Sequence, residues 1–205
     1  GYGRLLRVSS MRRIYFDYNA TTPIHPEVAA AVNPFWQEFF GNPSSLHWAG
    51  REVRGIYEDA RGKVAAALKA DPEEIIFTSG GTESDNHAVK GLAFSRREQG
   101  GHIITSSVEH PGVLNTCRYL ETKGFEVTYL PVDGEGLLSP GDVEKAIRKE
   151  TILISLMYAN NETGTLLPIA EVGAIARRHG IAMHSDMVQA LGKIDIDVAA
   201  LNVDL

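Results

Sequence analysis

The sequence has 205 residues, of which 43% are hydrophobic and 22% are charged, a balance typical of a globular protein with a buried core. A net charge of −6 argues against nucleic acid or an anionic membrane as the main partner, and no apolar run approaches the length of a membrane span. The single cysteine, Cys117, cannot form an internal disulfide, so we expect a reducing, cytoplasmic location. The seven histidines are scattered, so we expect no metal site.

The N-terminal third differs in character from the rest of the chain. Residues 1–10 contain no secretory signal, and we expect them to be a leader or an expression-derived addition because Met11 fits a native start. Residues 11–70 are expected to form a helical segment and a substrate-entrance loop. One apolar stripe runs from Val28 to Phe39 with a kink at Pro34, a second runs from Val53 to Leu68, and both are expected to pack into the core. The turn-forming loop at 40–52 between them is long enough to have a function.

From residue 71 onward, short apolar runs alternate with helical patterns. Strands are predicted at 75–78, 102–105, 126–130, 152–157 and 181–184, and helices at 83–97, 111–124, 139–150 and 168–180. Ser139 with Pro140 and Asp142 is typical of a capped helix start, and Gly180 of a helix end. This alternation predicts an α/β domain over 71–205, with a mostly parallel sheet between helices.

The stretch IIFTSGGTESDN predicts a strand, a glycine turn and a helix start. Gly80 and Gly81 allow a ligand close to the backbone, and Thr82 is predicted to cap the helix with Asp85 completing a capping box. Free N–H groups at a helix start favour an anion, most plausibly a phosphate. The spacing matches neither the dinucleotide fingerprint nor the nucleotide-triphosphate loop, so a nucleotide-binding protein is the weaker alternative.

Polar residues also follow the later strands. His110 comes after the strand at 102–105, Asn160 and Asn161 follow the strand at 152–157, and Asp186 follows the strand at 181–184. Each alone is typical of a turn, but the carboxyl ends of parallel strands converge on one crevice. An anion site, a histidine, an amide and a carboxylate suit a flat, phosphorylated, cationic heterocycle. Pyridoxal 5′-phosphate (PLP) fits that description, with Asp186 facing its pyridine nitrogen.

Six stretches together resemble the amino-terminal half of a cysteine desulfurase, a PLP enzyme of aminotransferase class V: YFDYNATTP, GNPSSLHWAG, FTSGGTESDN, VEHPGVL, NNETG and HSDMVQALGKIDID. The resemblance runs in family order from about residue 14 to residue 205. It implies the aspartate-aminotransferase-like fold (PLP fold type I), and it implies that NATTP and GNPSS line the substrate entrance and the dimer contact.

The resemblance also implies residue roles. Gly81 and Thr82 would bind the cofactor phosphate, and His110 would stack on the ring and act as the catalytic proton carrier. Asn161 and Gln189 would contact the ring hydroxyl, and Asp186 the ring nitrogen. It further implies that sulfur from L-cysteine passes to an enzyme persulfide with release of L-alanine, in a homodimer that supplies an iron–sulfur scaffold or another sulfur acceptor.

One departure from the family is serious. The lysine that holds PLP, the persulfide cysteine and the arginine for the substrate carboxylate would all lie beyond Leu205, so we expect a fragment that is inactive alone. Lys193 is not that lysine, and Cys117 fits a buried structural thiol. Two alternatives stay open: another class V enzyme, such as a selenocysteine lyase or an aminotransferase, and a non-catalytic PLP-binding or scaffold protein.

Overall fold

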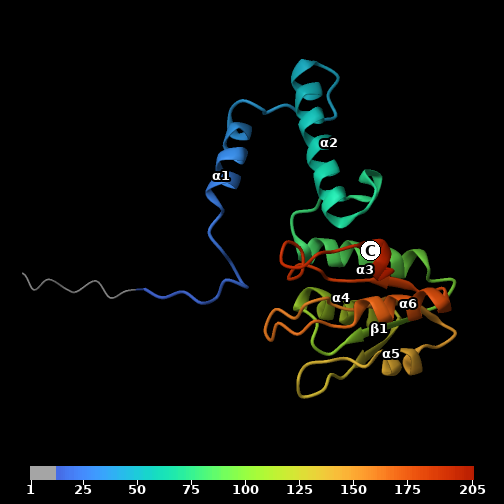
Figure 1. Ribbon diagram of the computed structural model, residues 1–205. Helices are drawn as coiled ribbons and strands as arrows, with labels where there is room; N and C mark the ends of the chain where they lie inside the picture. Colours follow the sequence, from blue (N-terminus) through green and yellow to red (C-terminus); the bar gives the residue numbers. More distant parts are fainter. Residues whose placement is uncertain (1–12) are drawn as a thin grey trace, which may run out of the picture.

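The computed structural model describes residues 13–205, so the predicted leader at 1–10 lies outside the described residues. Its centre is a four-stranded, all-parallel sheet in the order β2-β1-β3-β4 (Figure 1). The strands are β1 (His102–Ser106), β2 (Glu126–Leu130), β3 (Thr151–Ser155) and β4 (Ala182–His184). Four of the five predicted strands are therefore confirmed to within two residues at each end, as is the predicted α/β class.

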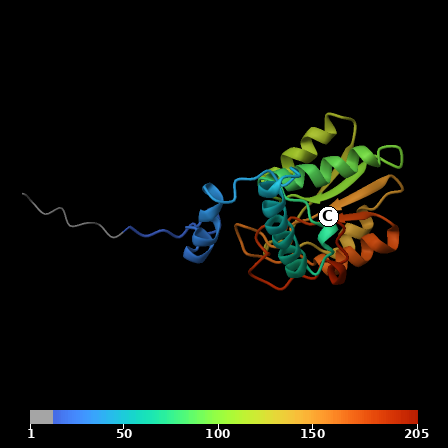
Figure 2. The ribbon, with the colours of Figure 1, turned by 90° about the horizontal axis from the view of Figure 1, so that it is seen from above.

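Helices cover both faces of this sheet. Val89 of α3 (Gly81–Ser95) and Leu120 of α4 (Pro111–Glu121) pack with Ile103 in one buried cluster. On the other face, the elements α5 (Pro140–Ala146) and α6 (Ile169–His179) contribute Val143 and Val172 to a second cluster. Figure 2 shows the two pairs of helices on opposite sides of the strands.

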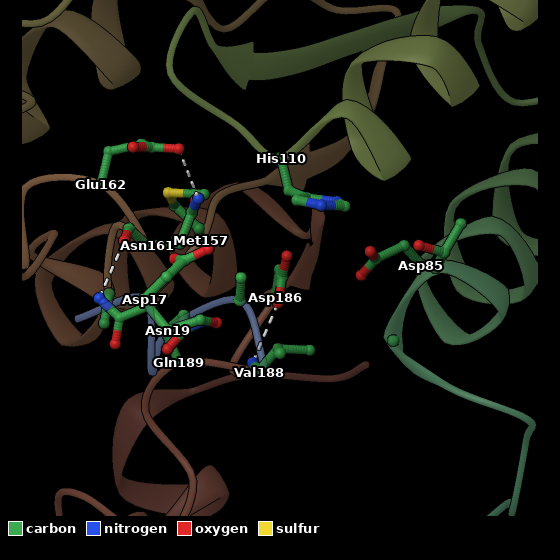
Figure 3. A pocket seen from close by; sticks show the side chains of 14 residues that line it. Asp17, Asn19, Asp85, His110, Met157, Asn161, Glu162, Asp186, Val188 and Gln189 are labelled. Carbon is green, nitrogen blue, oxygen red and sulfur yellow. Dashed lines mark hydrogen bonds between the residues drawn. The ribbon is translucent and has the colours of Figure 1, made fainter. Parts of the chain in front are cut away.

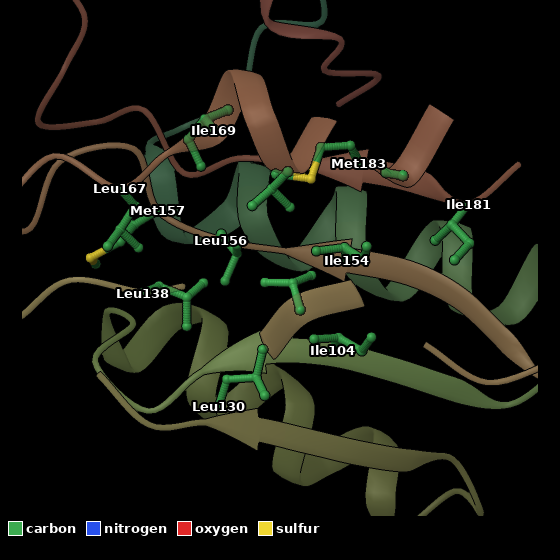
Figure 4. Close-up of a cluster of buried hydrophobic side chains, with 13 residues drawn as sticks. Ile104, Leu130, Leu138, Ile154, Leu156, Met157, Leu167, Ile169, Ile181 and Met183 are labelled. Atoms are coloured by element: carbon green, nitrogen blue, oxygen red, sulfur yellow. The ribbon is translucent and has the colours of Figure 1, made fainter. Parts of the chain in front are cut away.

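Successive side chains of each strand point to opposite faces of the sheet. Ile103 and Leu153 face the α3–α4 side, whereas their neighbours Ile104 and Ile154 face the α5–α6 side (Figure 4). All four are completely buried, which explains why these strands read as continuous apolar runs and not as alternating ones.

The prediction of a strand at residues 75–78 is wrong. Its backbone is extended but pairs with no strand among residues 13–205, and Ile76 and Phe77 are exposed. A high strand propensity does not make a strand without a neighbouring strand to bond.

The expectation that the N-terminal stripes form core is also wrong for the described chain. The kink is real: α1 (Pro26–Val32) passes into a 3-10 turn (Asn33–Trp36) at Pro34. However, α1 buries no residue and Trp36 is 76% exposed, because this segment stands away from the α/β body in both views (Figures 1 and 2). The stripe of α2 (Trp48–Leu68) is only partly covered, and a 3-10 turn (Pro72–Glu74) then leads to α3.

After β4 the chain forms α7 (Val198–Leu201) and returns to the sheet. Asp204 and Leu205 donate backbone hydrogen bonds to Met183, and Leu205 accepts one from Ser185, so the last residues run along β4. Within residues 13–205, no helix is both long and apolar enough to cross a membrane. No group of three or more metal-ligating side chains lies together in that same range.

Candidate functional site

A cavity of about 470 Å³ opens where β1, β3 and β4 end and α3 begins (Figure 3). This is the position at which open parallel sheets bind ligands. The six residues predicted as a site all line it: Gly81, Thr82, His110, Asn161, Asp186 and Gln189. Their elements are far apart in sequence, so the topology alone brings them together.

One wall of the cavity is the N-terminus of α3, whose unpaired N–H groups and dipole attract an anion. A Cβ on Gly81 would lie 2.6 Å from Val188 Cγ2, so a side chain at this position would force Val188 to shift. The predicted Thr82–Asp85 capping box is wrong, because the N-cap residue is Gly80. Glu83 takes over part of the capping role, since its carboxylate accepts the N–H of Ser79 at 2.7 Å.

His110 lies at the N-cap of α4 and points into the cavity. Its Nδ1 accepts the backbone N–H of Gly112 at 3.0 Å, so the neutral ring carries its proton on Nε2. A Cβ on Gly112 would lie 3.1 Å from that Nδ1 and 3.2 Å from Asp85 Oδ2, which shows how tightly this corner is packed. The ring therefore presents a donor, Nε2–H, to a ligand.

Asp186 follows β4 and serves two purposes. Its Oδ1 accepts the N–H of Val188 at 3.0 Å, the turn-stabilising bond that a lone aspartate commonly makes. Its Oδ2 accepts no hydrogen bond within residues 13–205, and the side chain lines the cavity. One oxygen is thus fixed by the backbone and the other is available to a cationic group.

Asn161 and Gln189 are joined by a residue from the N-terminal segment. Asn19 donates through Nδ2 to the backbone oxygen of Asn161 at 3.1 Å, and its own backbone oxygen accepts from Gln189 Nε2 at 2.9 Å. Lys193 donates to the Gln189 side-chain oxygen. Asp17, Asn19 and Ala20 consequently line the cavity, in agreement with the expectation that NATTP borders the site.

Two more carboxyl groups approach the site from its buried side. Glu109, 4% exposed, accepts from Ser106 Oγ at 2.6 Å and from the Met157 N–H at 3.1 Å through Oε1, while Oε2 has no partner in the described chain. Burial raises the pKa of Glu109 to about 8. Asp85 is also 4% exposed, and burial together with the charge of Asp186 raises its pKa to about 7.

Sequence reasoning missed Asp85 and Glu109 as parts of this region. Asp85 was interpreted as a helix cap, although its spacing from Gly81 and Thr82 places it one turn along the same helix face. Glu109 precedes His110 directly and its burial had no sequence signal. Asn160 is structural, because its Oδ1 accepts the N–H groups of Glu162 and Thr163.

Comparison with known proteins settles the family. The model of the aminotransferase class V family matches residues 14–205. The chain belongs to the aminotransferase class V family. The predicted resemblance is thereby confirmed, and members of this family are PLP-dependent enzymes.

Curated relatives of this class V chain carry a more specific name. The cysteine desulfurase IscS of Dictyoglomus turgidum is 56% identical over 194 residues, and that of Methanosarcina thermophila is 55% identical over 194 residues. Each alignment covers 95% of this chain but only 49% and 48% of the relative. The chain therefore spans about half the length of the curated relatives it matches.

Solved structures give the same result for the fold. A structure described as SspA in complex with cysteine has a TM-score of 0.90 and 47% identity, with 93% of this chain and 55% of that chain covered. A NifS-like protein has a TM-score of 0.91 and 42% identity, covering 94% and 53%. The PLP fold type I that the resemblance implied is confirmed.

Proposed function

We propose that this chain supplies the PLP-binding half of a cysteine desulfurase that converts L-cysteine to L-alanine and transfers the sulfur to an enzyme thiol as a persulfide. One observation carries the proposal: the six residues named from sequence line a single cavity, with an anion-binding helix start on one side and the free oxygen of Asp186 on another. The names of the relatives and the cysteine complex of SspA support the choice of substrate.

The residues present fit PLP in size and in chemistry. The cavity, at about 470 Å³, is large enough for a small aromatic phosphate, and the start of α3 at Gly81 presents backbone N–H groups of the kind that bind phosphates. Its lining includes four acidic residues, Asp17, Asp85, Glu162 and Asp186, and no lysine or arginine of the described chain. Such a lining favours a ligand whose remaining part is cationic, as a pyridinium is.

In this proposal, the N–H groups at Gly81 and Thr82 bind the phosphate and Asp186 Oδ2 holds the protonated ring nitrogen. His110 covers the ring and, with its proton on Nε2, donates to the substrate or to the ring hydroxyl region; Asn161 and Gln189 contact that hydroxyl. Bound PLP supplies an electron sink that labilises the bonds of the amino-acid substrate. The lysine, cysteine and arginine implied by the resemblance would lie outside this chain.

The finer biological setting is also part of the proposal. We infer a cytoplasmic homodimer that delivers sulfur to an iron–sulfur scaffold or another acceptor protein; the names of the IscS relatives support the iron–sulfur role. Cys117 is not the sulfur carrier in this scheme, because it is completely buried and burial raises the pKa of its thiol to about 12.

The test begins with a PLP titration of this chain, followed by borohydride reduction and peptide mass mapping. We expect saturable binding that Asp186→Ala weakens by about tenfold or more, without a specific lysine adduct. An adduct on Lys193, or binding that Asp186→Ala leaves unchanged, would contradict the assignment. For the complete protein, sulfide and alanine formation from L-cysteine without an amino acceptor identifies a desulfurase; alanine formed only with an acceptor would identify an aminotransferase.

A further inference from the structure

Asp85 is the least explained polar residue of the cavity. It is 4% exposed, lines the cavity, and makes no side-chain hydrogen bond within residues 13–205. Figure 3 shows it pointing from α3 toward the cavity, opposite Asn161 and Glu162. A buried carboxyl without hydrogen bonds is costly, so its retention at a ligand site needs a reason.

A second buried residue faces Asp85 from the sheet. His184 Nε2, at the end of β4, lies 3.6 Å from Asp85 Oδ1, and both side chains are 5% exposed. The other ring nitrogen of His184, Nδ1, is 2.8 Å from Ser155 Oγ on β3, so the ring is anchored to the strand next to its own. Ser155 thus anchors the His184 ring, and this ring lies against the Asp85 carboxyl at the cavity wall.

The charges around Asp85 are almost all negative or neutral. Asp186 and His184 face it from the β4 side, and Glu109 and His110 from the loop between β1 and α4. Burial lowers the pKa of His184 to about 4, so this ring is neutral at pH 7 and the contact with Asp85 is not an ion pair. A cation between Asp85 and Asp186 would relieve their mutual repulsion and favour the ionised form of both.

We propose that Asp85 is a positioning residue for the cationic ring of the cofactor: packed against His184, it acts with Asp186 to keep the ring nitrogen protonated. The inference rests on the proposed function, and it assigns Asp85 an electrostatic role without direct contact with the nitrogen. Asp186 accepts the hydrogen bond from the ring nitrogen, and Asp85 adds a second negative charge near it. Because the cavity wall is desolvated there, this charge acts through little screening.

The experiment uses 4′-deoxypyridoxine 5′-phosphate, a PLP analogue without the aldehyde, whose ultraviolet spectrum reports ring protonation and which cannot react with lysines. The midpoint pH of ring protonation is measured for the analogue bound to the unaltered chain and to Asp85→Asn. We expect Asp85→Asn to lower this midpoint by about one pH unit, a tenfold change in the protonation equilibrium, by analogy with other close carboxylate–cation pairs. Asp142→Asn, a matched change at an exposed position of α5, should leave it unaltered.

The outcomes separate the two levels of the proposal. If the analogue binds but Asp85→Asn and Asp142→Asn behave alike, the inference is overturned while the proposed function stands. If the unaltered, folded chain does not bind the analogue, the proposed function and the inference both fail. His184→Gln, which removes the ring packed against Asp85, provides a second variant should Asp85→Asn not fold, and it should lower the midpoint in the same direction. An unchanged midpoint in His184→Gln would then count against the inference.

Discussion

Replacing Glu109 by glutamine tests the electrostatics beneath the site. The substitution keeps the size of the side chain and the Oε1 acceptor that binds Ser106 and Met157, but removes the ability to ionise. Because burial raises the pKa of Glu109 in the folded chain to about 8 from an ordinary 4.5, the native state keeps a proton that the unfolded state releases.

Glu109 makes the folded state less stable as the pH rises, because only the unfolded state releases the proton readily. Below pH 4.5 both states hold the proton, and the contribution of Glu109 to stability is fully present; it declines as pH rises and is lost above about 8. At about 1.4 kcal/mol per pH unit, the gap between 4.5 and about 8 sets an upper limit of about 5 kcal/mol. We compare the free energy of unfolding of Glu109→Gln with that of the unaltered chain. This difference should move in favour of the variant by about 2–4 kcal/mol when the pH rises from 5 to 8.5.

The assay is urea unfolding followed by circular dichroism at the two pH values, with the exposed Glu98→Gln as the matched control. Taking the difference between variant and unaltered chain cancels the titration of groups that do not interact with Glu109; the charges of Asp85 and Asp186, which also raise the pKa of Glu109, stay part of the measured difference. A difference that stays constant from pH 5 to pH 8.5 would refute the reasoning, since it would mean that Glu109 ionises normally in the folded chain.

Three further outcomes are expected from the packing. Gly173→Ala should destabilise the chain by about 1–3 kcal/mol or more in the same urea assay, because its Cβ would lie 2.1 Å from an α7 carbonyl oxygen. Gly62→Ala, whose Cβ would have nothing within 4 Å, should be neutral or stabilise by up to about 1 kcal/mol. Cys117 should resist iodoacetamide in the native chain and react after denaturation, as mass spectrometry would show. Asn19→Ala should speed chymotryptic cleavage after Tyr18 by about fivefold, the factor for about 1 kcal/mol, because it removes the Nδ2 hydrogen bond to the Asn161 backbone oxygen while the backbone oxygen that accepts from Gln189 stays.

For each of these three predictions, one result would contradict the structure. Equal stabilities for the two glycine variants would place the α6–α7 contact elsewhere than the structure does. Rapid native labelling of Cys117 would show that its helix opens readily. Unchanged cleavage in Asn19→Ala would mean that the N-terminal segment is held on the cavity by other contacts.

Much of the fold was predictable because its signals are local. The apolar runs of β1 and β3 mark strands buried on both faces, and Pro140 and Gly180 mark a helix start and a helix end that depend only on backbone geometry. The segment at 75–78 has the same local signal but forms no strand, because pairing depends on a neighbour and not on propensity.

For the site, the sequence by itself determined the residues that follow a strand end, His110, Asn161 and Asp186, and the glycine turn and helix start at Gly81 and Thr82. A parallel sheet must bring such ends together, so their order along the chain was enough to predict one shared cavity. Only the tertiary structure decided the rest. Asn19 bridges Asn161 and Gln189 across more than 140 residues of chain, as its hydrogen bond to Asn161 shows, and no local pattern encodes that contact.

The same holds for the charges. Glu109 and Asp85 read as ordinary acids in the sequence, and their raised pKa values arise from burial that no pattern around them announces. The residue type decides which groups can titrate, whereas burial and neighbouring charges decide the pKa of each group. The sequence thus specified the cofactor-facing groups of this class V chain, and the packing of α3 against β4 placed a second carboxyl behind them.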